Sequence, residues 1–192
     1  MKKQNSITTS LSIVALVTAM LLAIPLVANS FTGEVNWTLS DFIFAGILLF
    51  GTGAIYVFIS RKSDSIMYRT AAGLTLFSAL FLIWSNLAVG IIGPEDNVAN
   101  FMYFGVVLIL IMGSALSRFR PHGMALALFS TALAQVATVP AALFMGMQNT
   151  PGSSAMEIIL LNGLFITLFM ISGVLFWQAE KDQISEQVSS SI

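Results

Sequence analysis

Long runs of apolar residues, separated by short polar segments, fill most of this chain. The runs cover residues 10–28, 42–60, 71–92, 101–116, 124–145 and 158–177. A helix needs about 20 apolar residues to cross a hydrocarbon core of roughly 30 Å, and we expect the short fourth run to borrow a turn from its flanks. Residues 180–192 form a polar tail too short to fold alone. The pattern predicts an all-α fold, a polytopic transmembrane bundle of six helices in a single domain, 1–192.

The basic residues predict how this bundle is oriented. Cytoplasmic loops carry an excess of Lys and Arg. All 8 basic residues fall in alternate loops and therefore on one side: Lys2, Lys3, Arg61, Lys62, Arg69, Arg118, Arg120 and Lys181. The loops on the other side contain only acidic charges: Glu34, Asp41, Glu95, Asp96 and Glu157. Both termini are therefore predicted to be cytoplasmic. The basic side chains are also suited to anionic lipid headgroups, although topology already accounts for them.

The first apolar run has a second interpretation. Lys2 and Lys3, the apolar stretch and the small-residue sequence Ala28-Asn29-Ser30 also resemble a secretory signal with its cleavage site. The stretch is longer than the 7–15 residues typical of such signals, so we favour a retained helix. Cleavage would leave five helices with the same orientation for the rest.

Composition supports the membrane class and excludes several others. Hydrophobic residues make up 57% of the 192 residues and charged residues 9%, against about 25% charged in soluble domains. The net charge of −1 offers no basic excess for nucleic acid. Without cysteine, the chain has no disulfide, thiolate metal site or thiol nucleophile. We expect the lipid bilayer as partner, and no cofactor or metal.

Amide and hydroxyl side chains inside three of the runs are the first candidate site. Asn86 lies in the third run, Gln135 and Thr138 share one face of the fifth, and Asn162 lies in the sixth. Counting along the helices places Asn86 at the depth of Thr138, with Asn162 in the same leaflet. Buried amides need partners in lipid. They either pair between helices or line a polar pocket or pathway.

The loop after the third run is the second candidate. Gly90, Gly93 and Pro94 end a helix, and Asp96 or Asn97 is suited to cap the fourth. Alternatively Glu95, Asp96 and Asn100 supply oxygen ligands for a hard cation. In the same way, Thr38-Leu39-Ser40-Asp41 predicts a capping box before the second run.

Other residues have structural interpretations. Gly46 and Gly53 share a helix face suited to close packing in the bundle or in an oligomer. Tyr103 and Tyr68 fall at run boundaries, where aromatic side chains anchor helices at the membrane interface. His122 is the only histidine and has a surface position. No nucleophile, phosphate-loop or metal motif is present, so we predict no enzymatic activity.

Several segments resemble a family of small, uncharacterised bacterial integral-membrane proteins. They are WSNLAVGIIGPEDN at 84–97, ANFMYFGV at 99–106, RFRPHGMA at 118–125, and Ala134-Gln135. The resemblance covers roughly 41–177, and Val98 stands where the family tends to have proline. It implies a multi-pass protein of the bacterial cytoplasmic (inner) membrane and supplies no mechanism.

Two functions remain open from the sequence. The first is a non-enzymatic membrane protein that acts by packing with itself, as a homo-oligomer, or with a membrane partner. The second is a small transporter or channel for a cation or polar solute, with Asn86, Gln135, Thr138 and Asn162 along its route. In that case Glu95 and Asp96 would attract cations at its mouth.

Overall fold

The structure, a computed structural model, describes residues 6–31 and 36–190, and the regular secondary structure within these ranges is entirely helical. Within these described ranges six helices are long and apolar enough to cross a membrane, which confirms the predicted number. The predicted contributions of Lys2, Lys3 and Glu34 to the loop charges lie outside the described residues. The single domain expected from the sequence stays a prediction; by the packing of its helices the chain divides into two compact units, 1–61 and 62–192. We describe each unit by itself.

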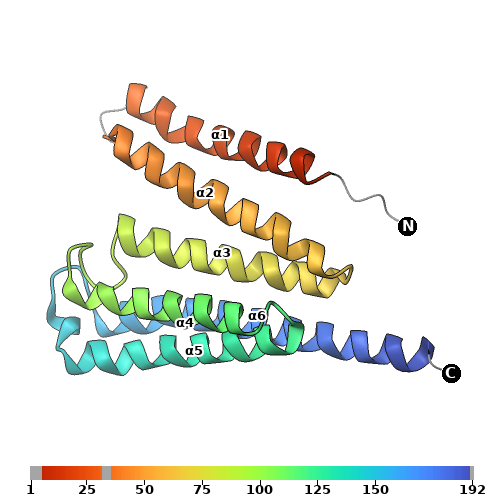
Figure 1. Cartoon of the computed structure of the whole chain (residues 1–192). Helices are drawn as coiled ribbons and strands as arrows, with labels where there is room; N and C mark the ends of the chain where they lie inside the picture. Colours follow the sequence, from red (N-terminus) through yellow and green to blue (C-terminus); the bar gives the residue numbers. More distant parts are fainter. Residues whose placement is uncertain (1–5, 32–35, 191–192) are drawn as a thin grey trace. The chain divides into compact units, whose positions relative to one another are not determined.

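The first unit is an antiparallel hairpin of α1 (Ile7–Phe31) and α2 (Leu39–Ile59) (Figure 1). At the loop end, Trp37 donates its backbone N–H to Asn29 Oδ1 (3.2 Å). The Asp41 carboxylate accepts from the Thr38 N–H at 2.7 Å and from its hydroxyl at 2.8 Å, which confirms the predicted capping residues. At the opposite end, the Arg61 guanidinium donates to Ser10 Oγ (3.1 Å).

The predicted glycine face of α2 packs inside this hairpin. A Cβ atom built on Gly53 would lie 2.5 Å from Val14 Cγ1, and one on Gly46 would lie 3.5 Å from Leu22 Cδ1. Real Cβ atoms essentially never approach a neighbour within 3.0 Å. Glycine at 53 therefore allows α1 and α2 to come this close, and its role is internal to the hairpin.

The second unit contains α3 (Ile66–Ala88), α4 (Met102–Leu116), α5 (Pro121–Phe144) and α6 (Ala155–Ser190). α6 packs against both α3 and α5, and α4 packs mainly against α5. Short 3-10 helices precede α4 (η2, Val98–Phe101) and follow α5 (η3, Met147–Asn149). η2 supplies the turn that the fourth run was expected to borrow.

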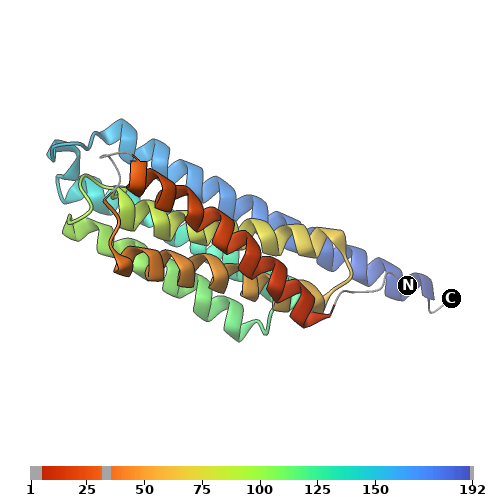
Figure 2. The same ribbon diagram turned by 90° about the horizontal axis from the view of Figure 1, so that it is seen from above.

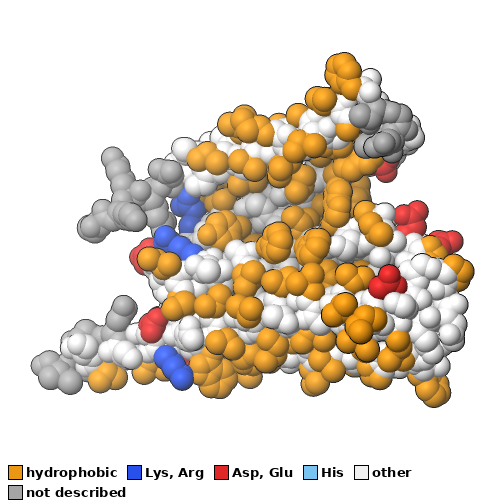
Figure 3. All heavy atoms as spheres, turned by 180° about the vertical axis from the view of Figure 1, so that it is seen from behind, with side chains coloured by type: hydrophobic (Ala, Val, Ile, Leu, Met, Phe, Trp, Pro, Cys, Tyr) orange, Lys and Arg blue, Asp and Glu red, His pale blue; other side chains and the backbone are white. Residues whose placement is uncertain are grey.

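One face of α6 forms the centre of this unit. Its fully buried residues recur at alternating steps of four and three, which keeps them on one stripe of a helix. None is more than 1% exposed: Ile158, Asn162, Phe165, Phe169, Ser172, Phe176 and Ala179. Many exposed side chains of these helices are large and apolar, and orange side chains run along the length of the unit on the face drawn in Figure 3.

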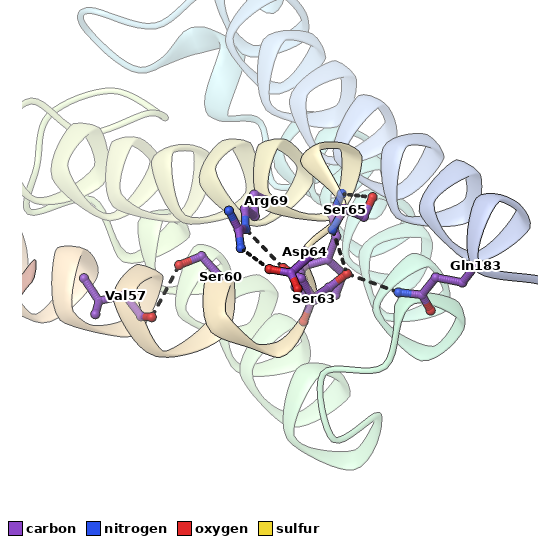
Figure 4. A network of polar contacts seen from close by, with 8 residues as sticks. Val57, Ser60, Ser63, Asp64, Ser65, Arg69 and Gln183 are labelled. Carbon is purple, nitrogen blue, oxygen red and sulfur yellow. Dashed lines mark hydrogen bonds and ion pairs between the residues drawn. The ribbon is translucent and has the colours of Figure 1, made fainter. Parts of the chain in front are cut away.

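The polar segment after the sixth run continues α6 as a helix. α6 reaches Ser190, and its blue C-terminal part extends past its neighbours in Figures 1 and 2. Gln183 Nε2 donates to Ser63 Oγ at 3.2 Å (Figure 4), and Glu180 Oε2 lies 2.9 Å from His122 Nδ1. The apolar run ends at residue 177 but the helix continues, because hydropathy reports where a helix becomes polar, and Glu, Lys and Gln continue a helix readily.

The third helix ends earlier than predicted, at Ala88 instead of residue 92. Gly90 and Gly93 have φ angles of +81° and +62°, a left-handed conformation that ends helices. Ile91 and Ile92 were counted as part of the apolar run. They lie in the loop after α3, where they are 3% and 0% exposed. Their apolar character therefore reflects a buried loop and not a longer helix.

Basic residues gather at one end of the second unit, where Asp64, Glu180 and Asp182 also lie. All its basic residues lie at the end that contains the turn before α3, the α4–α5 turn and the C-terminal part of α6. The Lys and Arg side chains that are visible on the face drawn in Figure 3 lie at one end, in blue. Glu95, Asp96 and Glu157 lie at the opposite end. This distribution is the one from which the membrane orientation is predicted.

Candidate functional site

Three helices bring four polar side chains together near the 89–101 loop. We call Tyr103 of α4, Gln135 and Thr138 of α5, and Asn162 of α6 the amide cluster. Gln135 and Asn162 are fully buried, and Tyr103 and Thr138 are at most 5% exposed. Asn162 is seven residues from the start of α6, roughly 10 Å along the helix.

The Asn162 side chain is the hub of the amide cluster. Its Oδ1 accepts hydrogen bonds from Gln135 Nε2 (2.8 Å), Thr138 Oγ1 (2.8 Å) and Tyr103 OH (3.1 Å). Its Nδ2 donates to the Ile158 carbonyl (2.7 Å), and this contact fixes which end of the amide faces the cluster. The sequence predicted that Gln135, Thr138 and Asn162 meet, and the structure brings them into direct contact.

More donors than lone pairs surround this oxygen. A carbonyl oxygen has two lone pairs, and three donors face Asn162 Oδ1. Thr138 Oγ1 also lies 2.7 Å from the Gln135 backbone carbonyl. Because a hydroxyl has a single proton, Thr138 donates to one acceptor at a time. The two shorter side-chain contacts and the longer Tyr103 contact therefore share the acceptor.

Two amide oxygens have no such donor. Gln135 Oε1 and Asn86 Oδ1 are buried and accept no hydrogen bond from the described residues. Asn86 is 4% exposed in α3, and among the described residues no hydrogen bond joins it to the amide cluster. An unpaired buried acceptor costs about 1–3 kcal/mol. In the described part of the chain, Gln148 Oε1 and Ser153 Oγ, in the segment after α5, are likewise buried without a hydrogen-bond partner.

The second candidate site is a folded loop. Asn100 Oδ1 accepts from the backbone N–H groups of Ile91 (3.2 Å) and Ile92 (2.9 Å), and Asn100 Nδ2 donates to the Pro94 carbonyl (3.0 Å). Asn97 caps η2 by accepting from the Ala99 N–H (3.0 Å). Asn97 therefore caps the 3-10 helix that leads into α4, whereas α4 itself begins after Phe101 without a side-chain cap.

The same loop does not form the alternative cation site from its three candidates. Both lone pairs of Asn100 Oδ1 are already used, and the residue is 3% exposed. Glu95 and Asp96 are exposed. In the part of the chain that the structure describes, no three His, Cys, Asp or Glu residues gather into a metal-binding group. Asn100 organises the loop, and the two carboxylates remain at its surface.

Sequence reasoning missed two tyrosines. Tyr103 and Tyr68 were interpreted as interface anchors, yet each is only 1% exposed. Tyr103 belongs to the amide cluster, and Tyr68 OH donates to the Phe119 carbonyl (2.7 Å) while its ring packs edge-on against Phe176. A tyrosine at a helix end is equally compatible with an interface position and a buried one. No sequence signal separates the two.

Comparison of the chain with protein-family models, with curated proteins and with solved structures finds no match. The resemblance noted from the sequence therefore stays a prediction, and the geometry alone must support a function. That geometry offers buried amides and hydroxyls, which donate and accept hydrogen bonds.

Proposed function

We propose that this chain is a multi-pass protein of the bacterial inner membrane, with cytoplasmic termini, that acts without catalysis by helix association with itself or a membrane partner. Six apolar helices of membrane-spanning length support the membrane class. The basic residues at one end of the second unit support the orientation.

One observation carries the association proposal. The four side chains of the amide cluster bond to one another across α4, α5 and α6: Tyr103, Gln135 and Thr138 all donate to Asn162 Oδ1. Interhelical hydrogen bonds of this kind hold membrane helices together. The amide cluster is thus suited to a rigid scaffold, and the outward helix faces are apolar and available to lipid or to another helix.

Crosslinking and native mass spectrometry of the full chain in lipid nanodiscs test this function. We expect a defined oligomer, or a stoichiometric complex with one membrane protein in its native membrane. A protein that stays a monomer without partners at every protein-to-lipid ratio contradicts the proposal.

A second function is favoured by the two unpartnered oxygens. Gln135 Oε1 and Asn86 Oδ1 are acceptors that a small hydrogen-bonding solute satisfies. The buried polar side chains of the described second unit are Ser, Thr, Asn and Gln, together with two tyrosines. A dehydrated cation there would lack a countercharge. Of the two solute classes predicted, this environment suits a neutral polar solute better.

Flux in proteoliposomes distinguishes the two functions. The transport alternative predicts uptake of a neutral solute such as glycerol or urea that Gln135→Leu abolishes. Thr167→Val is the matched control, because Thr167 is exposed and bonds only to the Gly163 carbonyl of its own helix (2.8 Å). Absence of flux in a folded, oligomeric sample supports association.

A further inference from the structure

The turn between α4 and α5 has an unusual backbone. Arg118 and Phe119 have φ angles of +51° and +61°, and they are the only non-glycine residues with positive φ in the described parts of the chain. This region is unfavourable for residues with a Cβ atom, above all for bulky ones. Such conformations persist only where the surroundings hold them, and they concentrate at functional sites.

Contacts from α3 and the turn before it hold this conformation. Tyr68 OH donates to the Phe119 carbonyl (2.7 Å), and Lys62 Nζ donates to the Arg118 carbonyl (3.5 Å). The same Nζ lies 4.8 Å from the centre of the Phe119 ring, within the range of a cation–π contact. The Phe119 N–H bonds to Ser117 Oγ (3.2 Å). The strained turn is therefore fixed on several sides.

The result is a set of cations without acidic partners. Lys62, Arg118 and Arg120 are exposed. The ion pairs among the described residues are Arg69–Asp64 and His122–Glu180, and neither includes these three side chains. Lys62 Nζ keeps donors free beyond its carbonyl contact, and a guanidinium presents a planar fork of N–H groups suited to phosphate oxygens.

Exposed apolar side chains lie at the same end of the unit. Leu116, the last residue of α4, is 80% exposed, and Ile66, the first of α3, is 81% exposed. Both belong to helices of membrane-spanning character. An anionic phospholipid matches this combination, because its phosphate meets cations at the membrane surface while its acyl chains meet apolar residues.

We propose that the α4–α5 turn is a binding site for an anionic phospholipid, with Lys62, Arg118 and Arg120 on the headgroup phosphate and Leu116 and Ile66 along the acyl chains. The fixed backbone of the turn holds Arg118 and Arg120 near Lys62 in the absence of lipid. This site is independent of the association and transport functions above.

Native mass spectrometry of the full chain, titrated with phosphatidylglycerol or phosphatidylcholine in detergent, tests the site. Each basic residue near an anionic surface contributes about fivefold in affinity. We expect phosphatidylglycerol to bind more tightly than phosphatidylcholine, and Arg118→Gln or Lys62→Gln to weaken it about fivefold each. Arg118→Lys should restore most of the affinity, because it keeps the charge.

Lys181→Gln is the matched control, since Lys181 is an exposed cation on the C-terminal part of α6. It should leave lipid affinity unchanged, and circular dichroism should show that all variants keep their helix content. Equal binding of the two lipids, or equal loss in the control, overturns the proposal. If millimolar inorganic phosphate displaces bound phosphatidylglycerol as effectively as added phosphatidylglycerol does, the turn binds soluble anions, and this result also overturns the proposal.

Discussion

Replacing Asn162 with leucine removes the oxygen on which the amide cluster depends while nearly preserving side-chain size. Tyr103 OH and Gln135 Nε2 then lose their acceptor, whereas Thr138 keeps the Gln135 backbone carbonyl at 2.7 Å. Leucine also cannot donate to the Ile158 carbonyl as Asn162 Nδ2 does. The loss is therefore concentrated on two donors from two neighbouring helices.

The magnitude follows from these contacts. Interhelical hydrogen bonds in membranes average about 0.6 kcal/mol, so the two contacts that are lost outright, from Tyr103 and Gln135, give roughly 1 kcal/mol. Each buried donor left unpaired adds about 1 kcal/mol or more, which puts the total at about 2–4 kcal/mol. Reversible unfolding of the full chain in mixed micelles, titrated with dodecyl sulfate, measures this free energy.

Two further variants keep the reasoning open to refutation. Thr167→Val on the same helix removes only an intrahelical bond at an exposed position, and it should change the free energy by less than about 0.5 kcal/mol. In a double-mutant cycle, Asn162→Leu and Gln135→Leu should couple by about 0.6–1.7 kcal/mol. If Asn162→Leu behaves like Thr167→Val, or if the two losses simply add, the hub assignment is refuted.

Three other substitutions address the remaining features. Gly53→Ala should destabilise the hairpin by about 1–3 kcal/mol, because its Cβ would lie 2.5 Å from Val14 Cγ1. Gly51→Ala is the control and should be neutral or stabilising, because nothing lies within 4 Å of its Cβ. Equal melting temperatures for the two variants contradict the close packing at Gly53. Asn100→Ala should speed hydrogen exchange of the two loop amides bound to its Oδ1, whereas unchanged protection argues against that role. Glu180→Gln should lower the free energy of unfolding by less than about 1 kcal/mol in a thermal melt, since exposed ion pairs contribute little. A larger loss of stability shows that Glu180 does more than pair with His122.

The helices were largely predictable because a membrane span leaves a strong composition signal. All six apolar runs became helices of spanning length. Their ends were less predictable, since hydropathy and helix formation are separate properties. α6 continues as a polar helix to Ser190, and α3 stops at Ala88 although Ile91 and Ile92 are apolar.

The site was partly predictable for a similar reason. Helical spacing placed Gln135 and Thr138 on one face, and the shared leaflet brought Asn162 toward them. Tyr103 was missed because its position at a helix end fits two environments. Asn100 was ambiguous in the same way, because an amide oxygen can coordinate a metal ion or accept a hydrogen bond from a backbone N–H.

By itself the sequence determined that this chain is all-helical, that six of its segments match a membrane span, and that its basic residues fall in alternate loops. These properties depend on local composition and on spacing along one helix. Only the tertiary structure decided that Asn162 Oδ1 receives three donors, that Gln135 Oε1 receives none, and that the α4–α5 turn is held in a left-handed conformation. Those outcomes depend on which helices are neighbours and on their rotation, which the periodicity of a single segment leaves open.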